Sequence, residues 1–157
     1  MTDYAATYPT NIAVDERVKR FISAFYDISD TPSRNDDWVD CFAPDALLVV
    51  GHQRARGVEE IRRLREGMWD QVRSRRHRLG KVFPAAFESP ERKPEDEGEG
   101  EGEGRRRRFE YMLHGSVELE LKSGERLVRE WAGRAVLTVT DGEEGGLRYG
   151  FYQVYLV

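Results

Sequence analysis

The chain has 157 residues, of which 39% are hydrophobic, and its formal net charge at pH 7 is −4. This length is typical of one domain with a sizeable core, and so mild a charge argues against a nucleic-acid partner. One cysteine, Cys41, excludes an intramolecular disulfide, and its apolar setting favours an inert thiol. No apolar run approaches the roughly 20 residues that span a bilayer, and the N-terminus lacks a secretion signal. We therefore expect a cytoplasmic protein without membrane or nucleic-acid partners.

The N-terminal half predicts three helices after a loose tail at residues 1–10. An apolar stripe at spacings of four, three, four and three residues predicts the first helix, capped near Asn11; it consists of Val14, Val18, Phe21, Phe25 and Ile28. A short helix around Trp38 stops at Pro44, and a third helix is expected over 58–74. Between these helices, 45–50 reads as a strand and 51–57 as a connection or tight hairpin. The basic residues at 73–78 are interpreted as the solvated end of the third helix.

The C-terminal part predicts a sheet. Residues 109–121, 127–139 and 147–156 form three long amphipathic segments separated by turn residues, and 77–87 is a further candidate strand. In the first segment Tyr111 shares one face with Leu113, while His114 lies on the other face. Long antiparallel strands after a helical half predict an α+β fold with the helices on one side of a curved sheet.

Residues 88–108 differ in composition from the rest of the chain. They contain a Gly-Glu repeat and end in four consecutive arginines, without apolar residues that could form a core. Such a composition is typical of a disordered loop, and a role as a docking arm remains an alternative.

The order of predicted elements and five short stretches resemble a known superfamily. The stretches are 21–26, 38–46, 57–61, 131–134 and 151–155. Together they resemble the nuclear transport factor 2-like superfamily, in particular the SnoaL-like branch and its small fungal members, over residues 14–157 apart from the charged loop.

This resemblance implies a single SnoaL-like domain over 1–157, with a cone-shaped curved antiparallel sheet packed on three N-terminal helices. It also implies a homodimer through the outer sheet face. Relatives include polyketide cyclases, dehydratases, ketosteroid isomerases, epoxide hydrolases and non-catalytic proteins.

Cofactor and metal motifs are missing from the sequence. There is no Gly-x-Gly-x-x-Gly fingerprint or phosphate-binding loop, and His52, His77 and His114 are too widely spaced for a zinc motif. We therefore expect acid–base chemistry without a cofactor, in which a pocket adjusts the pKa of a carboxylate or histidine.

Glu130 and His114 are the candidate catalytic residues. Glu130 lies in the middle of a predicted strand among small and apolar neighbours, which would desolvate its carboxylate and raise its pKa. Its alternative role is a structural pair with Arg134 or an exposed position at a dimer surface. His114, on the preceding strand, is suited to proton transfer or to the dimer interface.

The candidate substrate-binding residues are Tyr26, Arg34, Trp38, His52, Tyr111 and Arg134. The resemblance implies that Tyr26 and Trp38 are cavity walls, although both also suit a simple core. Arg34 would bind an anionic or carbonyl group at the rim, and His52 would lie at the cavity mouth. Tyr111 and His114 line one cavity only if a bulge near Gly115 changes the register.

Two function classes remain open. The first is a cofactor-independent isomerase, cyclase, dehydratase or hydrolase that acts on a hydrophobic oxygenated small molecule, with secondary metabolism as the setting that the resemblance implies. The second is a non-catalytic small-molecule-binding or dimeric scaffold protein. Nuclear transport is a third and more distant reading, because only the fold argues for it.

Overall fold

A computed structural model describes residues 4–85, 108–139 and 146–156 of the chain. Its helices are α1 (Glu16–Ser29), α2 (Asn35–Asp40) and α3 (Gly57–Gly67). Its strands are β1 (Phe42–Val50), β2 (Gln53–Arg56), β3 (Val72–Ala85), β4 (Arg108–Leu121), β5 (Arg126–Val139) and β6 (Leu147–Leu156). The predicted α+β class is confirmed.

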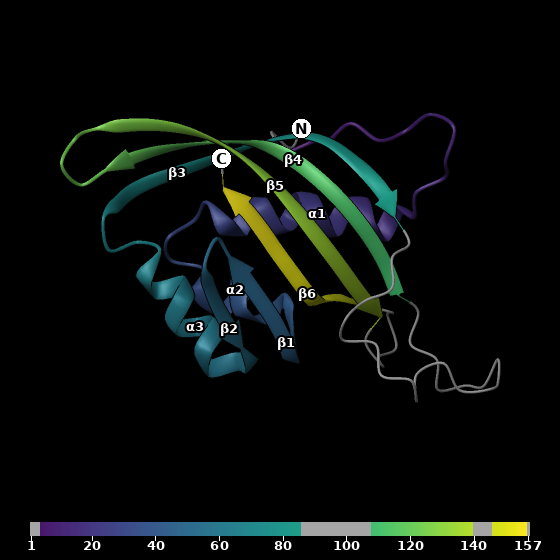
Figure 1. Cartoon of the computed structure of the whole chain (residues 1–157), viewed down its shortest axis with the longest axis horizontal. Helices are drawn as coiled ribbons and strands as arrows, with labels where there is room; N and C mark the ends of the chain where they lie inside the picture. The colour runs from purple at the N-terminus through teal and green to yellow at the C-terminus, as the bar shows by residue number, and fades with distance from the viewer. Residues whose placement is uncertain (1–3, 86–107, 140–145, 157) are drawn as a thin grey trace.

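All six strands form one sheet in the order β2-β1-β6-β5-β4-β3. The long strands β3, β4 and β5 arch over α1, while α2 and α3 lie at one end of the arch (Figure 1). The sheet is mixed rather than wholly antiparallel as predicted, because β1 pairs with β6 in parallel. This pairing joins the two halves of the chain in one sheet, with β2 at the edge beyond β1.

The first helix matches the predicted apolar stripe but begins later. The Asp15 side chain accepts a hydrogen bond from the backbone N–H of Arg17, so the cap is Asp15 and not Asn11. Val18, Ile22 and Phe25 are buried on the side that faces the sheet. The amphipathic helix is therefore held by packing of one face against the concave side of the sheet.

The third helix ends at Gly67, seven residues before the predicted end at 74, and the basic segment belongs to β3. This prediction was wrong because arginines favour a helix locally, whereas pairing with β4 decides the conformation. In the strand, His77 lies opposite Val117 on the inner face, and Arg78 lies opposite Ser116 on the outer face. The basic cluster is consequently divided between the two sides of the sheet.

The N-terminal segment is not the predicted loose tail where the structure describes it. Tyr4 is buried, and Thr7 bridges to β3: its N–H donates to the carbonyl of Gly80 at 2.9 Å, and its carbonyl accepts from Val82 at 3.0 Å. The segment is therefore fixed to the edge of β3 at this point, and it covers the edge there. The predicted disordered loop at 88–108 lies outside the described residues except for Arg108, which begins β4.

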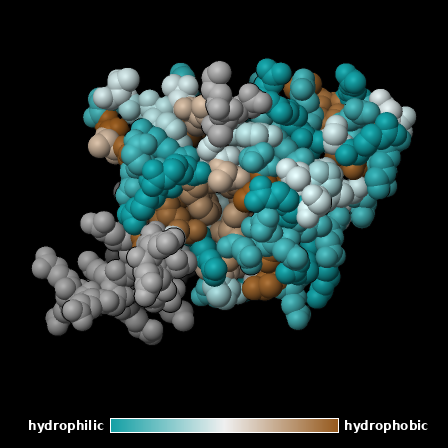
Figure 2. Space-filling view, turned by 180° about the vertical axis from the view of Figure 1, so that it is seen from behind, coloured by the Kyte–Doolittle hydropathy of each residue, from teal (hydrophilic) through white to brown (hydrophobic). Residues whose placement is uncertain are grey.

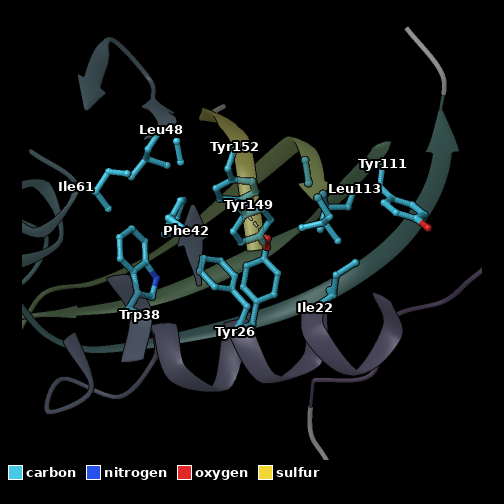
Figure 3. Close-up of a cluster of buried hydrophobic side chains, with 14 of the residues drawn as sticks. Ile22, Tyr26, Trp38, Phe42, Leu48, Ile61, Tyr111, Leu113, Tyr149 and Tyr152 are labelled. Atoms are coloured by element: carbon cyan, nitrogen blue, oxygen red, sulfur yellow. Dashed lines mark hydrogen bonds between the residues drawn. The ribbon is translucent and has the colours of Figure 1, made fainter. Parts of the chain in front are cut away.

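Aromatic rings fill the space between α1 and the sheet (Figure 3). The ring of Phe25 has five aromatic neighbours with centroids 4.8–6.0 Å away: Tyr26, Trp38, Phe42, Tyr149 and Tyr152. The hydroxyls of Tyr26 and Tyr152 share a hydrogen bond of 2.5 Å in this core. Edge-to-face and offset contacts of this kind add to the stabilisation from burial.

The opposite, outer face of the sheet carries a smaller apolar cluster, formed by Leu47, Val49, Val136 and Phe151. The guanidinium of Arg134 lies 5.5 Å from the Phe151 ring centroid, and its Nε donates to Glu110 Oε1 at 2.7 Å. An ion pair thus lies beside this second cluster.

Gly115 is required where β3 bulges. The β3–β4 register shifts between Leu79 and Val82, opposite Gly115 and Leu113. A Cβ atom on Gly115 would lie 2.2 Å from the carbonyl oxygen of Arg78 and 2.9 Å from Cζ2 of Trp131. We expect Gly115→Ala to lower the free energy of unfolding by about 1–3 kcal/mol in urea titrations, because backbone must move.

Gly67→Ala is the matched control, since the nearest atom to a Cβ there is 3.9 Å away and alanine favours the helix that ends at this residue. Equal stability of the two variants would contradict the close approach of β3 and β4 at Gly115.

The buried phenols predict a loss of stability in alkali. Burial raises the pKa of Tyr26, Tyr149 and Tyr152 above the ordinary value of 10.0. The folded state thus retains protons that the unfolded state releases, so this stability is complete below about pH 10 and is lost as pH rises further. Urea unfolding above pH 10 should show a lower free energy of unfolding than near neutral pH, with a smaller pH dependence in Tyr152→Phe. Phenolate absorbance that develops for all tyrosines while the far-UV signal stays native would contradict this prediction.

Candidate functional site

A carboxylate at the end of α1 meets a histidine in the middle of β3. Asp30 Oδ1 lies 2.5 Å from His77 Nδ1, and Asp30 Oδ2 accepts the backbone N–H of His77 at 2.7 Å. The exposed fractions of the two side chains are 5% for Asp30 and 14% for His77. Two hydrogen bonds from one residue therefore fix the orientation of the carboxylate relative to the imidazole.

The contact defines the proton arrangement of His77. Because the carboxylate is the acceptor, Nδ1 carries the proton, and the lone pair of the neutral ring is on Nε2. Within the residues that the structure describes, Nε2 has no hydrogen-bond partner. The ring lies 5.0 Å from the Tyr26 ring and 5.8 Å from that of Trp131, centroid to centroid. The arrangement can accept a proton at Nε2 while Asp30 stabilises the resulting imidazolium.

A third donor reaches Asp30 from the N-terminal segment. Tyr4 donates its hydroxyl proton to Asp30 Oδ2 at 2.8 Å. Burial, and then the hydrogen bond to Asp30, raise the pKa of Tyr4 above its ordinary range. The carboxylate thus accepts from Tyr4 and from the backbone of His77 while it contacts the imidazole, and these bonds keep it directed at His77.

The interior near this pair also contains polar groups without partners. Among the described residues, the buried hydroxyl of Tyr149 and the buried indole N–H of Trp131 have no hydrogen-bond partner. Trp131 stacks on Tyr26, whose hydroxyl bonds to Tyr152. Buried donors without acceptors are rare, and each lowers stability because its desolvation is not compensated.

The predicted catalytic residues lie elsewhere. Glu130 is exposed on the outer face, in register with Ser116, and His114 is exposed on the same face, in register with Ala132. Both line an open groove of about 470 Å³ together with Arg78, Leu79, Gly80, Gly115, Ser116, Trp131 and Ala132. The sheet separates them from the interior that contains His77. The burial on which the assignment of Glu130 depended is therefore missing.

Arg134 also lies on the outer face and bonds to Glu110, not to Glu130 as the structural alternative had it. The β4–β5 register is continuous through Gly115, so Tyr111 lies on the inner face and His114 on the outer face. The bulge that would have united them occurs in β3 instead.

The remaining predicted residues divide between core and surface. Tyr26 and Trp38 are buried in the aromatic core, where the indole N–H of Trp38 donates to the Ser29 hydroxyl at 3.0 Å. Arg34 forms a surface ion pair with Asp37 at 2.8 Å. His52 is exposed in the turn between β1 and β2. Only Tyr26 of the predicted set contacts the ring of His77.

Sequence reasoning missed Asp30 and His77 because each lay in a segment that it treated as a boundary. Asp30 ends α1, and His77 stood within a run of arginines that predicted a helix end. The candidate strand 77–87 did place His77 on one face with Leu79, but Arg75 extends the same face, so alternation gave no signal that distinguished His77.

Other reactive groups are less suited to a site. Burial, followed by the charges of Asp40 and Asp37, raises the pKa of the Cys41 thiol to about 12, which fits the predicted inert thiol. The described residues contain no group of three or more His, Cys, Asp or Glu side chains placed to hold a metal ion.

None of the described helices is both long and apolar enough to cross a membrane. Apolar side chains gather in a hollow on the rear surface (Figure 2).

No protein-family model and no curated protein matches the sequence. Solved structures do match in fold. A provisionally named aromatic ring hydroxylase from Novosphingobium aromaticivorans has a TM-score of 0.72 at 14% identity, over 94% of this chain and 92% of that one. A provisionally named scytalone dehydratase from the same species has a TM-score of 0.65 at 11% identity, covering 90% and 83%. A hexachlorocyclohexane dehydrochlorinase from Novosphingobium barchaimii has a TM-score of 0.67 at 10% identity, covering 90% and 84%.

These similarities at low identity extend over nearly the whole described chain and concern the arrangement of its elements. Together with the curved six-stranded sheet and its three helices, they establish that the chain has the nuclear transport factor 2-like fold.

Proposed function

We propose that this protein is a cofactor-independent enzyme that removes a proton from a hydrophobic oxygenated small molecule, with His77 as the base. The observation that carries the proposal is the contact between Asp30 Oδ1 and His77 Nδ1 at 2.5 Å within the concave side of the sheet. A carboxylate that holds the Nδ1–H tautomer leaves Nε2 as the proton acceptor, which is the arrangement a general base requires.

The proposed reaction is an elimination or an isomerisation. Nε2 of His77 accepts a proton from carbon, and the electron pair of that C–H bond forms a double bond. In a dehydration, the neighbouring C–O bond breaks and the imidazolium returns the proton to the departing hydroxide as water. In an isomerisation, the proton returns to a different carbon. Two buried phenol protons are suited to an oxygen on which charge develops: that of Tyr149, and that of whichever hydroxyl of the Tyr26–Tyr152 pair does not donate to the other.

The comparisons support this class of reaction by analogy. One protein of similar fold is provisionally named a scytalone dehydratase and another is a dehydrochlorinase, and both names describe eliminations. Within this proposal the chain belongs to the SnoaL-like branch and acts in secondary metabolism, as the resemblance of its sequence to small fungal members implies. Cyclase and hydrolase activities remain alternatives, because the same base would also serve them.

A second candidate function is a non-catalytic scaffold. It is favoured by the packing of the interior, where Phe25 and Trp38 are buried and Met68 packs against the same core. In that case the Asp30–His77 contact would only attach α1 to β3, and its removal would lower stability.

The first test of the enzyme proposal measures proton removal directly. The protein is incubated in D₂O with a panel of cyclic hydroxyketones and polycyclic aromatic ketones, and deuterium uptake and product formation are followed by mass spectrometry. For any compound that reacts, we expect His77→Gln to lower the rate by about 10² to 10⁴-fold, since an amide cannot accept the proton. Asp30→Asn should also lower the rate, because the amide N–H can donate to Nδ1 and so favour the Nε2–H tautomer, in which Nε2 cannot accept a proton.

His114→Gln and Glu130→Gln are the controls, since both residues are exposed on the outer face. We expect each to retain the native rate. A rate that falls in Glu130→Gln but persists in His77→Gln would refute the role of His77 and return catalysis to the outer groove.

We also propose a homodimer through the outer face of the sheet. Tyr155, Ala132 and His114 are in register across β6, β5 and β4, and Phe83 of β3 stacks on His114 at 6.2 Å. Tyr155 and Phe83 are 43% and 48% exposed, so the row leaves aromatic surface in water. A second copy would cover it, which supports the dimer.

Tyr155→Glu should therefore dissociate the dimer, because it places a carboxylate within the row. Light scattering at micromolar concentration should give twice the monomer mass of 18.2 kDa for the native chain and the monomer mass for the variant. Val58→Glu, at a residue of α3 that is equally exposed at 44%, should remain dimeric. A native mass of 18.2 kDa would refute the dimer.

A further inference from the structure

Arg65, near the end of α3, is a fully buried cation. Its exposed fraction is 0%, and no ion pair joins it to a carboxylate among the described residues. Taking a guanidinium out of water is expensive unless its donors are satisfied. The contacts that hold Arg65 therefore require an explanation.

Its donors converge on the turn that follows α1. Nη1 donates to the Ser29 carbonyl at 2.9 Å, and Nη2 donates to the carbonyls of Ile28 and Thr31, each at 3.3 Å. Nε donates to the side-chain amide oxygen of Asn35 at 2.9 Å. The carbonyls lie on both sides of Asp30 in the sequence. One guanidinium thus fixes the backbone immediately before and after the carboxylate that contacts His77.

Two indole rings make cation–π contacts with this guanidinium. Its carbon lies 5.2 Å from the ring centroid of Trp38 and 4.9 Å from that of Trp69. Arg75 lies 5.1 Å from the same Trp69 ring. A planar group between two indoles keeps its forked donors in one orientation, which a lysine ammonium cannot reproduce.

We propose that Arg65 is a positioning residue, which holds the turn after α1 so that the Asp30 carboxylate faces Nδ1 of His77. The catalytic consequence rests on the proposed function, whereas the geometric one does not. Among the described residues no hydrogen bond joins Arg65 to His77, so it acts through the backbone on either side of Asp30.

The electrostatics agree with this geometry. Burial and then repulsion from Arg75 lower the pKa of Arg65 to about 10, while the negative charge of Asp30 acts in the opposite direction. The same carboxylate also opposes the effect of burial on Arg75. A buried and a half-buried cation therefore lie in the field of Asp30, and among the described residues no hydrogen bond or ion pair joins either of them to its carboxylate.

The tautomer of His77 is the readout, because a merely structural role would not move it. Long-range ¹⁵N–¹H NMR of ¹⁵N-histidine protein distinguishes Nδ1–H from Nε2–H in a neutral imidazole. His77→Gln assigns its signal among the three histidines. In the native protein we expect the Nδ1–H tautomer to dominate. In Asp30→Asn we expect this tautomer no longer to dominate.

Arg65→Lys keeps the positive charge but removes the planar set of guanidinium donors. We therefore expect a clear rise of the Nε2–H tautomer of His77 in a folded protein. The matched control is Arg62→Lys, on the same helix, whose arginine forms a surface ion pair with Asp36. A folded Arg65→Lys protein with the native tautomer would overturn the proposal. If Arg65→Lys fails to fold, Asn35→Ala removes one acceptor of Arg65 and should shift the tautomer in the same direction; an unchanged tautomer there would likewise overturn it.

The two proposals fail in different ways. A tautomer that depends on Arg65, combined with full turnover by His77→Gln, would leave the positioning role intact and refute the proposed catalytic role. Loss of turnover in His77→Gln with an unaffected tautomer in Arg65→Lys would support the catalytic role of His77 and refute the positioning role of Arg65.

Discussion

The contact between Asp30 and His77 joins two parts of the chain that are 47 residues apart, and much of the structure serves to bring them together. α1 must lie inside the curve of the sheet for its C-terminal end to reach the middle of β3. The aromatic core around Phe25 holds it there. A carboxylate and an imidazole at this distance need fixed backbones on both sides, because either side chain alone can rotate away.

That requirement explains why the elements nearest the contact are secured by unusual means. Besides its local capping bonds, the turn after α1 is held by a buried guanidinium and by the bond from Trp38 to Ser29. On the other side, Tyr4 reaches Asp30 from a segment that pairs with the edge of β3. The first two contacts join α3 and α2 to the end of α1, and the third joins Asp30 to a segment paired with β3, so the position of Asp30 depends on tertiary packing throughout.

The two faces of the sheet have different chemical characters. The inner face combines His77 with aromatic rings, and it includes buried donors that lack acceptors at Tyr149 and Trp131. Such groups lower stability, and natural proteins tend to retain them where a ligand or mechanism uses them. The outer face has an ion pair between Arg134 and Glu110 and an open groove. Residues two apart in one strand share a face, so a shift of one residue decides which role a side chain can have.

Much of the architecture was accessible from the sequence alone. The stripe of Val18, Phe25 and their neighbours predicted α1, alternation around Tyr111 predicted β4, and the turn residues separated the last three strands. These signals are local, because they depend on the period of one helix or strand. They also established that Tyr111 and His114 lie on opposite faces in an unbroken strand.

The tertiary structure decided the rest, because it depends on partners distant in the sequence. Pairing with β4 made an arginine-rich segment extended and turned His77 inward, and parallel pairing with β6 placed β1 within the same sheet. Burial of Arg65 and exposure of Glu130 follow from the same pairings, and no local pattern distinguishes a buried arginine or an exposed glutamate from its neighbours. Periodicity determines which element a residue belongs to, whereas only the packed chain determines what that residue faces.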